Sequence, residues 1–143
     1  MRDNIPILLV EDDQVDVMTV QRAFKRNNII NPLTVVGNGL EALEYLHHRG
    51  AFADHSAFPT PGIILMDINM PLMNGIECLK EIKADEHLRK LPVIMLTTSK
   101  EECDRVESFK LSVAGYIIKP VEFEKFVEAV KVLNLYWTLS ELP

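Results

Sequence analysis

Side chains that can do acid, nucleophilic or ion-binding chemistry follow the most apolar stretches of this sequence. Glu11, Asp12 and Asp13 come directly after one apolar run, and Asp67 ends another within the stretch IILMDINMP. Later runs are followed by the remaining polar groups, which are Thr97, Thr98 and Lys119. Carboxylates, hydroxyls and an ammonium group therefore recur at equivalent positions along the chain, and their chemistry depends on whether the fold brings them together.

A cluster of these carboxylates predicts a divalent cation. Glu11, Asp12 and Asp67 would repel one another and raise their pKa values unless positive charge lay between them. Lys119 supplies one charge, and Mg²⁺ supplies the rest, because this ion binds through one or two carboxylates and keeps several waters. Asp67 would then be a nucleophile of aspartyl-phosphate chemistry, with Mg²⁺, Lys119 and the Thr97 hydroxyl stabilising the phosphoryl oxygens.

Each residue taken alone also has an ordinary structural explanation. Asp13 is suited to a helix N-cap, Asp67 to a turn, Lys119 to a solvated strand end and Thr97 to a satisfied hydroxyl. Their joint occurrence at the ends of successive apolar runs favours a site. The absence of a glycine-rich loop after the first run argues against a dinucleotide or P-loop site.

Five short apolar runs and the segments between them would position these groups. The runs are continuous rather than alternating, which is typical of parallel strands covered on both faces, and they span 6–10, 33–36, 63–66, 92–96 and 115–118. Apolar residues recur at helical spacing in the intervening segments, namely Val17, Val20, Phe24; Leu40, Ala42, Leu43, Leu46; Ile76, Leu79, Ile82; Val106, Phe109, Val113; and Phe123, Phe126, Val130. The alternation predicts a doubly wound (βα)5, flavodoxin-like α/β fold, with a parallel five-stranded sheet and helices on both faces. Ligands of such folds bind at the carboxyl ends of the strands.

Composition narrows the class of protein further. The chain has 143 residues and a formal charge of −6, which predicts one domain and argues against nonspecific nucleic-acid binding. It contains no apolar run long enough to span a membrane. Cys78 and Cys103 lack metal-ligand spacing, so we expect reduced thiols and a cytoplasmic location.

Two segments are longer than a minimal (βα)5 domain requires. The loop at about 48–62 is longer than usual connections and is either a partner-binding segment or a silent surface loop. The last helix carries a second apolar stripe, formed by Ala129, Val132, Leu133 and Tyr136, that continues into an apolar tail at about 134–143. This stripe needs a covering, either the chain's own tail or a second subunit.

Taken as a set, the motifs resemble the receiver domain of bacterial two-component response regulators. The resemblance runs from ILLVEDD at 7–13 to the final helix and rests on Glu11–Asp12, on Asp67 in LMDINMP with Gly75, on Thr97 in MLTTS and on Lys119 in YIIKP. It implies a single receiver domain over 1–143 without an effector domain. Such a protein accepts a phosphoryl group from a sensor histidine kinase and turns over no external metabolite.

The resemblance also implies a role for each matching residue. Asp67 is the phosphoacceptor and Lys119 binds the phosphate, with a cis bond to Pro120. Mg²⁺ is the cofactor, and its ligands are Asp67, Asp12, Glu11 through water, and the backbone carbonyl of Asn69.

A switch and a gate follow from the same resemblance. Thr97 and Tyr116 correspond to the switch pair, which reshapes the surface of the fourth helix, fifth strand and fifth helix on phosphorylation. Thr98 and Asn69 correspond to positions that gate access to the phosphate or its hydrolysis.

The loop and tail are similar to those of stand-alone regulators that pair with phytochrome-type histidine kinases. That similarity implies a homodimer through the last helix and tail, with interface candidates Phe123, Val132, Leu133, Tyr136 and Trp137. We expect the kinase to dock near the first helix, at Arg22, Lys25 and Arg26.

Two other functions remain open at this point. One is a pseudo-receiver, which binds proteins independently of phosphate but usually lacks one of the key residues. The other is a haloacid-dehalogenase-like phosphatase, which requires a second Asp two residues after the nucleophile, where this chain has Asn69.

Overall fold

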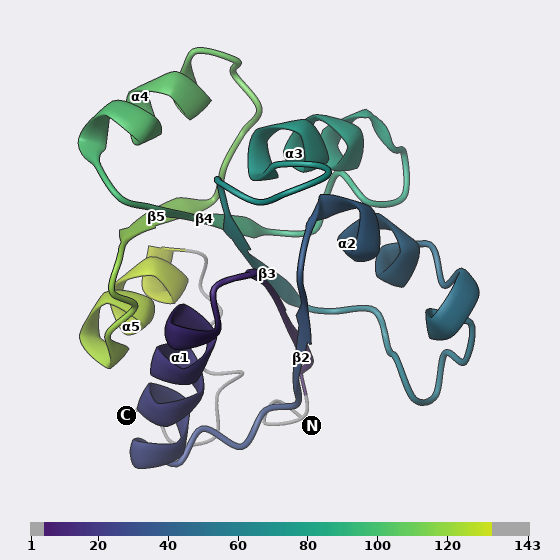
Figure 1. Cartoon of the computed structure of the whole chain (residues 1–143), viewed down its shortest axis with the longest axis horizontal. Coiled ribbons are helices and arrows are strands. Elements are labelled where there is room, and N and C mark those ends of the chain that lie inside the picture. The colour runs from purple at the N-terminus through teal and green to yellow at the C-terminus, as the bar shows by residue number, and fades with distance from the viewer. Residues whose placement is uncertain (1–4, 133–143) are drawn as a thin grey trace.

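A computed structural model describes residues 5–132, and the predicted alternation of strands and helices is present in it (Figure 1). In this part of the chain the parallel sheet has the order β2-β1-β3-β4-β5 and comprises β1 (Ile7–Val10), β2 (Leu33–Val36), β3 (Ile63–Asp67), β4 (Val93–Thr97) and β5 (Gly115–Ile118). The α-helices are α1 (Gln14–Arg26), α2 (Gly39–Leu46), α3 (Gly75–Ala84), α4 (Lys100–Glu107) and α5 (Phe123–Val132). The flavodoxin-like fold predicted from the sequence is confirmed.

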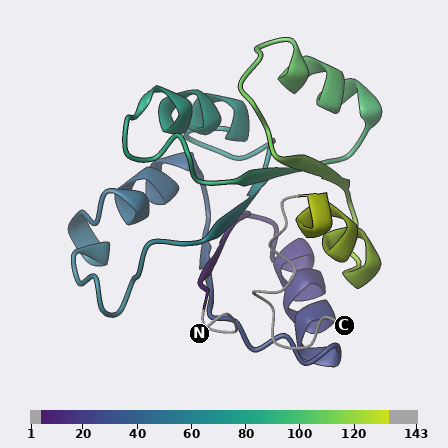
Figure 2. The same ribbon diagram turned by 180° about the vertical axis from the view of Figure 1, so that it is seen from behind.

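Helices cover both faces of the sheet, as the continuous apolar runs predicted. Helices α1 and α5 lie on one face and α2, α3 and α4 on the other, as Figures 1 and 2 show from opposite sides. Within β1, Ile7 and Leu9 join the core beneath α1 and α5, whereas Leu8 and Val10 join the core beneath the other helices. All four side chains are buried because helices cover both faces of the sheet, which explains why the strand is a continuous apolar run.

The predicted apolar stripes were wrong at a few positions. Leu40 in α2 is 45% exposed, while Phe109 and Val113 lie beyond the end of α4. Phe109 is 42% exposed, and the Lys80 ammonium lies 3.8 Å from its ring centroid. The ring of Phe109 therefore packs against a cation outside the core. The helical spacing of Val106, Phe109 and Val113 did not indicate a longer α4.

The long loop at 48–62 is folded against α2. It contains a short 3-10 helix, η2 (Gly50–Phe52), and its aromatic side chains pack around Tyr45 of α2. The Tyr45 ring centroid lies 5.3 Å from that of Phe52 and 5.9 Å from that of Phe58. The Tyr45 hydroxyl also donates to the Pro59 carbonyl at 2.9 Å. The loop therefore has a small aromatic core of its own.

The dimer candidates fall mostly beyond what the structure describes. Phe123 begins α5, is half-buried and packs against the core beneath α1 and α5. Leu133, Tyr136 and Trp137 lie outside the described residues, as does the side chain of Val132. No helix in residues 5–132 is long and apolar enough to cross a membrane.

Candidate functional site

The carboxyl ends of the strands surround an open pocket of about 560 Å³. Most of the candidate residues line it, and its full lining is Glu11, Asp12, Asp13, Asp16, Asp67, Asn69, Thr98, Lys119 and Pro120. These residues follow β1, β3, β4 and β5, so the topology brings together groups separated by more than a hundred positions in sequence. The cluster expected from the sequence exists as one site.

Asp67 is the last residue of β3 and is one of the residues that line this site. Its side chain is buried, and Oδ1 lies 2.7 Å from the Lys119 Nζ. Burial raises the pKa of Asp67, and the contact with Lys119 opposes that rise. Gly75 supports the backbone here, because its N–H donates to the Ile68 carbonyl at 2.8 Å and a Cβ in its place would collide with the Asp67 carbonyl.

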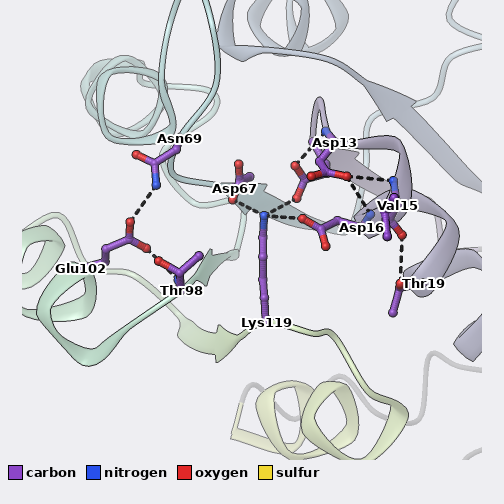
Figure 3. A network of polar contacts seen from close by, with 10 residues as sticks. Asp13, Val15, Asp16, Thr19, Asp67, Asn69, Thr98, Glu102 and Lys119 are labelled. Carbon is purple, nitrogen blue, oxygen red and sulfur yellow. Dashed lines mark hydrogen bonds and ion pairs between the residues drawn. The ribbon is translucent and has the colours of Figure 1, made fainter.

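Lys119 neutralises part of the negative charge. Its Nζ lies 2.8 Å from Glu11 Oε1 and 2.9 Å from Asp16 Oδ2, besides the contact with Asp67 (Figure 3). Burial disfavours the ammonium, but the three carboxylates outweigh it and raise the pKa of Lys119. The Lys119–Pro120 peptide bond is cis, as the resemblance implied.

Glu11 is buried, and each of its carboxylate oxygens has one close partner. Its Oε2 accepts from the Asp13 N–H at 3.1 Å, and its Oε1 lies 2.8 Å from the Lys119 ammonium. Burial raises the pKa of Glu11 to about 7, although the contact with Lys119 lowers it. A further positive charge near this carboxylate would stabilise its ionised form.

The carboxylates fit a divalent metal ion. Glu11, Asp12 and Asp67 each offer a ligand atom, and these atoms lie within 4.8 Å of one another. Two of the residues are buried and Asp12 is exposed, which leaves one side open to solvent. Oxygen donors with open positions suit a hard cation that keeps some of its waters.

The two switch candidates lie apart from the pocket lining and contact α4. Thr97 ends β4 fully buried, and its Oγ1 lies 3.6 Å from the Cys103 sulfur. The Tyr116 hydroxyl donates to the Glu107 carboxylate at 2.8 Å. Burial and this carboxylate raise the pKa of Tyr116, so the phenol remains protonated and keeps donating. Both side chains are thus bonded to one helix.

Asp13 has the structural role that the sequence left open for it. It is the N-cap of α1, and its Oδ1 accepts from the backbone N–H groups of Val15 and Asp16 at 2.8 and 3.3 Å. The carboxylate is therefore committed to the helix end.

Two acidic residues of the site were missed from the sequence. Asp16 lies in the first turn of α1 and adds a third carboxylate to Lys119, and Glu102 of α4 bonds to Asn69 and Thr98. The spacing Asp13-x-x-Asp16 placed Asp16 one turn beyond the acidic cluster, and the sequence Ser99-x-x-Glu102 is a helix-start signal. Neither pattern indicates the long-range contact.

Comparison with known proteins assigns the family. Residues 7–131 match the model of the response regulator receiver domain. This chain belongs to that family.

The relatives of this receiver include regulators named for phytochromes. The response regulator Rcp1 of Synechocystis sp. is 35% identical over 131 residues, covering 92% of this chain and 87% of Rcp1. The solved bacteriophytochrome response regulator RtBRR is 41% identical with a TM-score of 0.87, covering 97% of this chain and 83% of its own. The phosphorylated cyanobacterial phytochrome response regulator RcpA is 34% identical with a TM-score of 0.75, covering 94% of each chain.

Membership of the family gives the site its general chemistry. Receivers are phosphoryl-accepting signalling proteins that interact with histidine kinases, and they bind a divalent metal ion in an acidic pocket. A structure of Rcp1, 34% identical to this chain with a TM-score of 0.73 and covering 94% of each, contains Mn²⁺. Glu11, Asp12 and Asp67 form an acidic cluster that could hold such an ion in this receiver.

Proposed function

We propose that Asp67 is the phosphoacceptor of this receiver. A carboxylate oxygen of Asp67 forms a bond to the phosphorus of a kinase phosphohistidine as the P–N bond breaks, and the imidazole nitrogen keeps the electron pair. The observation that carries this proposal is the position of Asp67, buried at a strand end with Lys119 Nζ at 2.7 Å. The ammonium is available to offset negative charge on the phosphoryl oxygens.

We propose Mg²⁺ as the metal ion, with Asp12 and Asp67 as ligands, Glu11 acting through water and Asn69 contributing its backbone carbonyl. The carboxylate ligand atoms within 4.8 Å of one another support this set, as does the pocket-lining position of Asn69. When bound, Mg²⁺ supplies positive charge that screens the carboxylates and the phosphoryl oxygens. The protein's own contribution is to hold the carboxylates close and to keep the Lys119 ammonium beside Asp67.

The signal leaves through the surface formed by α4, β5 and α5. Thr97 and Tyr116 are the proposed switch pair, and Thr98 and Asn69 gate the phosphoryl group. In the structure the side chains of Thr97 and Tyr116 contact α4, so a change in the position of either side chain would break or alter its contact with this helix. Movement of the Thr97 hydroxyl towards Asp67 requires that it leave Cys103.

The proposed phosphodonor is a phytochrome-type histidine kinase of the cytoplasm. The names of the solved relatives RtBRR and RcpA support the phytochrome assignment, and the free thiols of Cys78 and Cys103 suit a reducing compartment. Docking of the kinase near Arg22, Lys25 and Arg26 is supported by the exposure of all three on α1. A homodimer through α5 and the tail remains part of the proposal.

The other two functions are less well supported. A pseudo-receiver would be expected to lack the acceptor, the acidic pair or the lysine, and all are present and clustered here. A phosphatase would need an acid where Asn69 donates its side-chain amide to Glu102. We therefore propose that the protein catalyses only its own phosphorylation and dephosphorylation.

A kinase-free phosphorylation assay tests this function. The full chain is incubated with Mg²⁺ and acetyl phosphate, and intact mass spectrometry counts the phosphoryl groups added. We expect one group on the wild type and none on Asp67→Asn, whereas the matched variant Asp54→Asn, altered at an exposed carboxylate of the long loop outside the pocket lining, retains it. An unlabelled wild type would contradict the proposal, and rapid turnover of phosphomonoesters would favour a phosphatase.

A further inference from the structure

Glu102 connects two walls of the phosphorylation pocket. Its Oε2 accepts from the Asn69 side-chain amide at 2.7 Å, and its Oε1 accepts from the Thr98 backbone N–H at 2.8 Å. Asn69 follows β3 and Thr98 follows β4, and both line the pocket that contains Asp67. Figure 3 shows Glu102 beside these two residues, with Lys119 and Asp16 beyond Asp67. One carboxylate therefore bridges the two strand ends beside the phosphoacceptor.

Helix capping alone does not explain this arrangement. In α3 the capping box is reciprocal, because Asn74 and Glu77 each accept from the other's backbone N–H. In α4 the Ser99 hydroxyl accepts from the Glu102 N–H at 3.3 Å, but the Glu102 carboxylate reaches Thr98 instead of returning to Ser99. Its second oxygen, Oε2, accepts from the Asn69 side chain, which lies outside the helix. In α4 the carboxylate half of a capping box therefore bonds to two residues of the pocket lining and not to the N-cap backbone.

The bridge carries a fixed negative charge. Partial burial disfavours ionisation, but the hydrogen bonds from Thr98 and Asn69 outweigh it and hold the pKa of Glu102 below its ordinary value. A phosphoryl group on Asp67 would bring further negative charge and new acceptor oxygens into the same pocket. It would repel Glu102 and compete with it for nearby donors.

We propose that Glu102 is a positioning residue that opposes phosphorylation in the resting state. Its carboxylate holds the Asn69 amide and the Thr98 N–H until a phosphoryl group on Asp67 displaces it. Release of Glu102 frees the first turn of α4, the helix that also contacts Thr97 and Tyr116. This inference rests on the proposed phosphorylation of Asp67, and it adds a contact that couples the pocket directly to α4.

The test compares Glu102→Gln with Glu101→Gln. The exposed Glu101 occupies the same helical turn, and the bridge to Asn69 and Thr98 is made by Glu102, so the Glu101 variant removes an equal charge without altering the bridge. The initial rate of labelling by acetyl phosphate is measured with Mg²⁺ at low and high salt. We expect Glu102→Gln to be labelled about two- to five-fold faster than wild type, the range in which partly exposed charges change a rate constant. The advantage should shrink at high salt, and Glu101→Gln should match wild type.

Ser99→Ala separates the bridge from helix capping. It removes the cap of α4 but keeps the Glu102 carboxylate, so a faster rate in this variant would assign the effect to helix fraying and overturn the proposal. Equal rates for the two glutamine variants would also overturn it. If the wild type is not labelled at all, the phosphoacceptor assignment fails first, which is a different result from labelling that is insensitive to Glu102. Urea unfolding of each variant confirms that the folded proteins are being compared.

Discussion

Replacement of Glu11 by Gln should stabilise the metal-free protein. Glu11 is 1% exposed and close to Asp67, so its ionised form is disfavoured in the fold despite the ion pair with Lys119. Gln has nearly the same shape, stays neutral and can still accept the hydrogen bond from the Asp13 N–H. The substitution therefore isolates the cost of the buried charge.

The magnitude follows from the pKa of Glu11. It rises from 4.5, taken for the unfolded chain, to about 7 in the fold. A pKa that differs by one between the two states is worth about 1.4 kcal/mol, so the charged side chain costs the fold about 3 kcal/mol. The folded state binds the proton more tightly, so stability is lost as the pH rises from about 4.5 to about 7 and then levels off. We expect Glu11→Gln to gain about 2 to 3 kcal/mol at pH ~8 and nothing below pH ~4.5.

Urea denaturation with a chelator present, repeated over this pH range, measures the free energy of unfolding of both proteins. Replacement of Glu86, an exposed acid on the connection after α3, by Gln provides the control. In a parallel series with Mg²⁺ and no chelator, the ion should stabilise the wild type more than Glu11→Gln, because ligands that bind the folded state raise its stability. If the difference in free energy of unfolding between wild type and Glu11→Gln stays constant with pH, or if Glu11→Gln is the less stable protein, the buried charge of Glu11 does not destabilise the fold as proposed.

Four further substitutions test other parts of the site and the fold. Lys119→Met should lower the rate of phosphorylation by acetyl phosphate at least about 100-fold, because the ammonium beside Asp67 is lost; a rate near wild type would contradict its role. Gly75→Ala should cost more than about 2 kcal/mol in urea unfolding, since its Cβ collides with the Asp67 carbonyl. Gly115→Ala, whose Cβ meets its nearest atoms at 3.9 Å, should change stability by less than about 1 kcal/mol. Tyr45→Phe should lose about 1 kcal/mol with its hydroxyl bond to the long loop, and an unchanged free energy of unfolding would show that the bond contributes nothing net.

The fold and the central cluster were predictable because they depend on strong local patterns. Five continuous apolar runs identified the strands, and parallel topology requires that the residues ending them meet at one edge. Asp67 and Lys119 could therefore be placed together from the sequence alone. Both β3 and β4 end one residue later than predicted, at Asp67 and Thr97, because a polar group at a strand end still takes part in the sheet, and β4 also begins one residue later, at Val93.

Contacts between side chains on different elements were not predictable in the same way. The spacing of Phe109 suited a helix, but its ring pairs with the Lys80 ammonium of α3. Glu102 carried the sequence signal of a capping box, yet its second oxygen bonds to Asn69, 33 residues away. Such contacts depend on where the loops place side chains of different elements at the sheet edge. The local spacing of residues in the sequence does not predict which of these side chains meet.

Chemical mapping of the phosphorylated residue shows whether Asp67 carries the phosphoryl group. After incubation with Mg²⁺ and acetyl phosphate, borohydride reduction converts an aspartyl phosphate to homoserine, and peptide mass spectrometry locates the change. We expect homoserine at position 67 alone, and far less of it after the same incubation when Lys119 is replaced by Met. Homoserine at Asp12 or Asp16 instead, or none in the wild type, would contradict it.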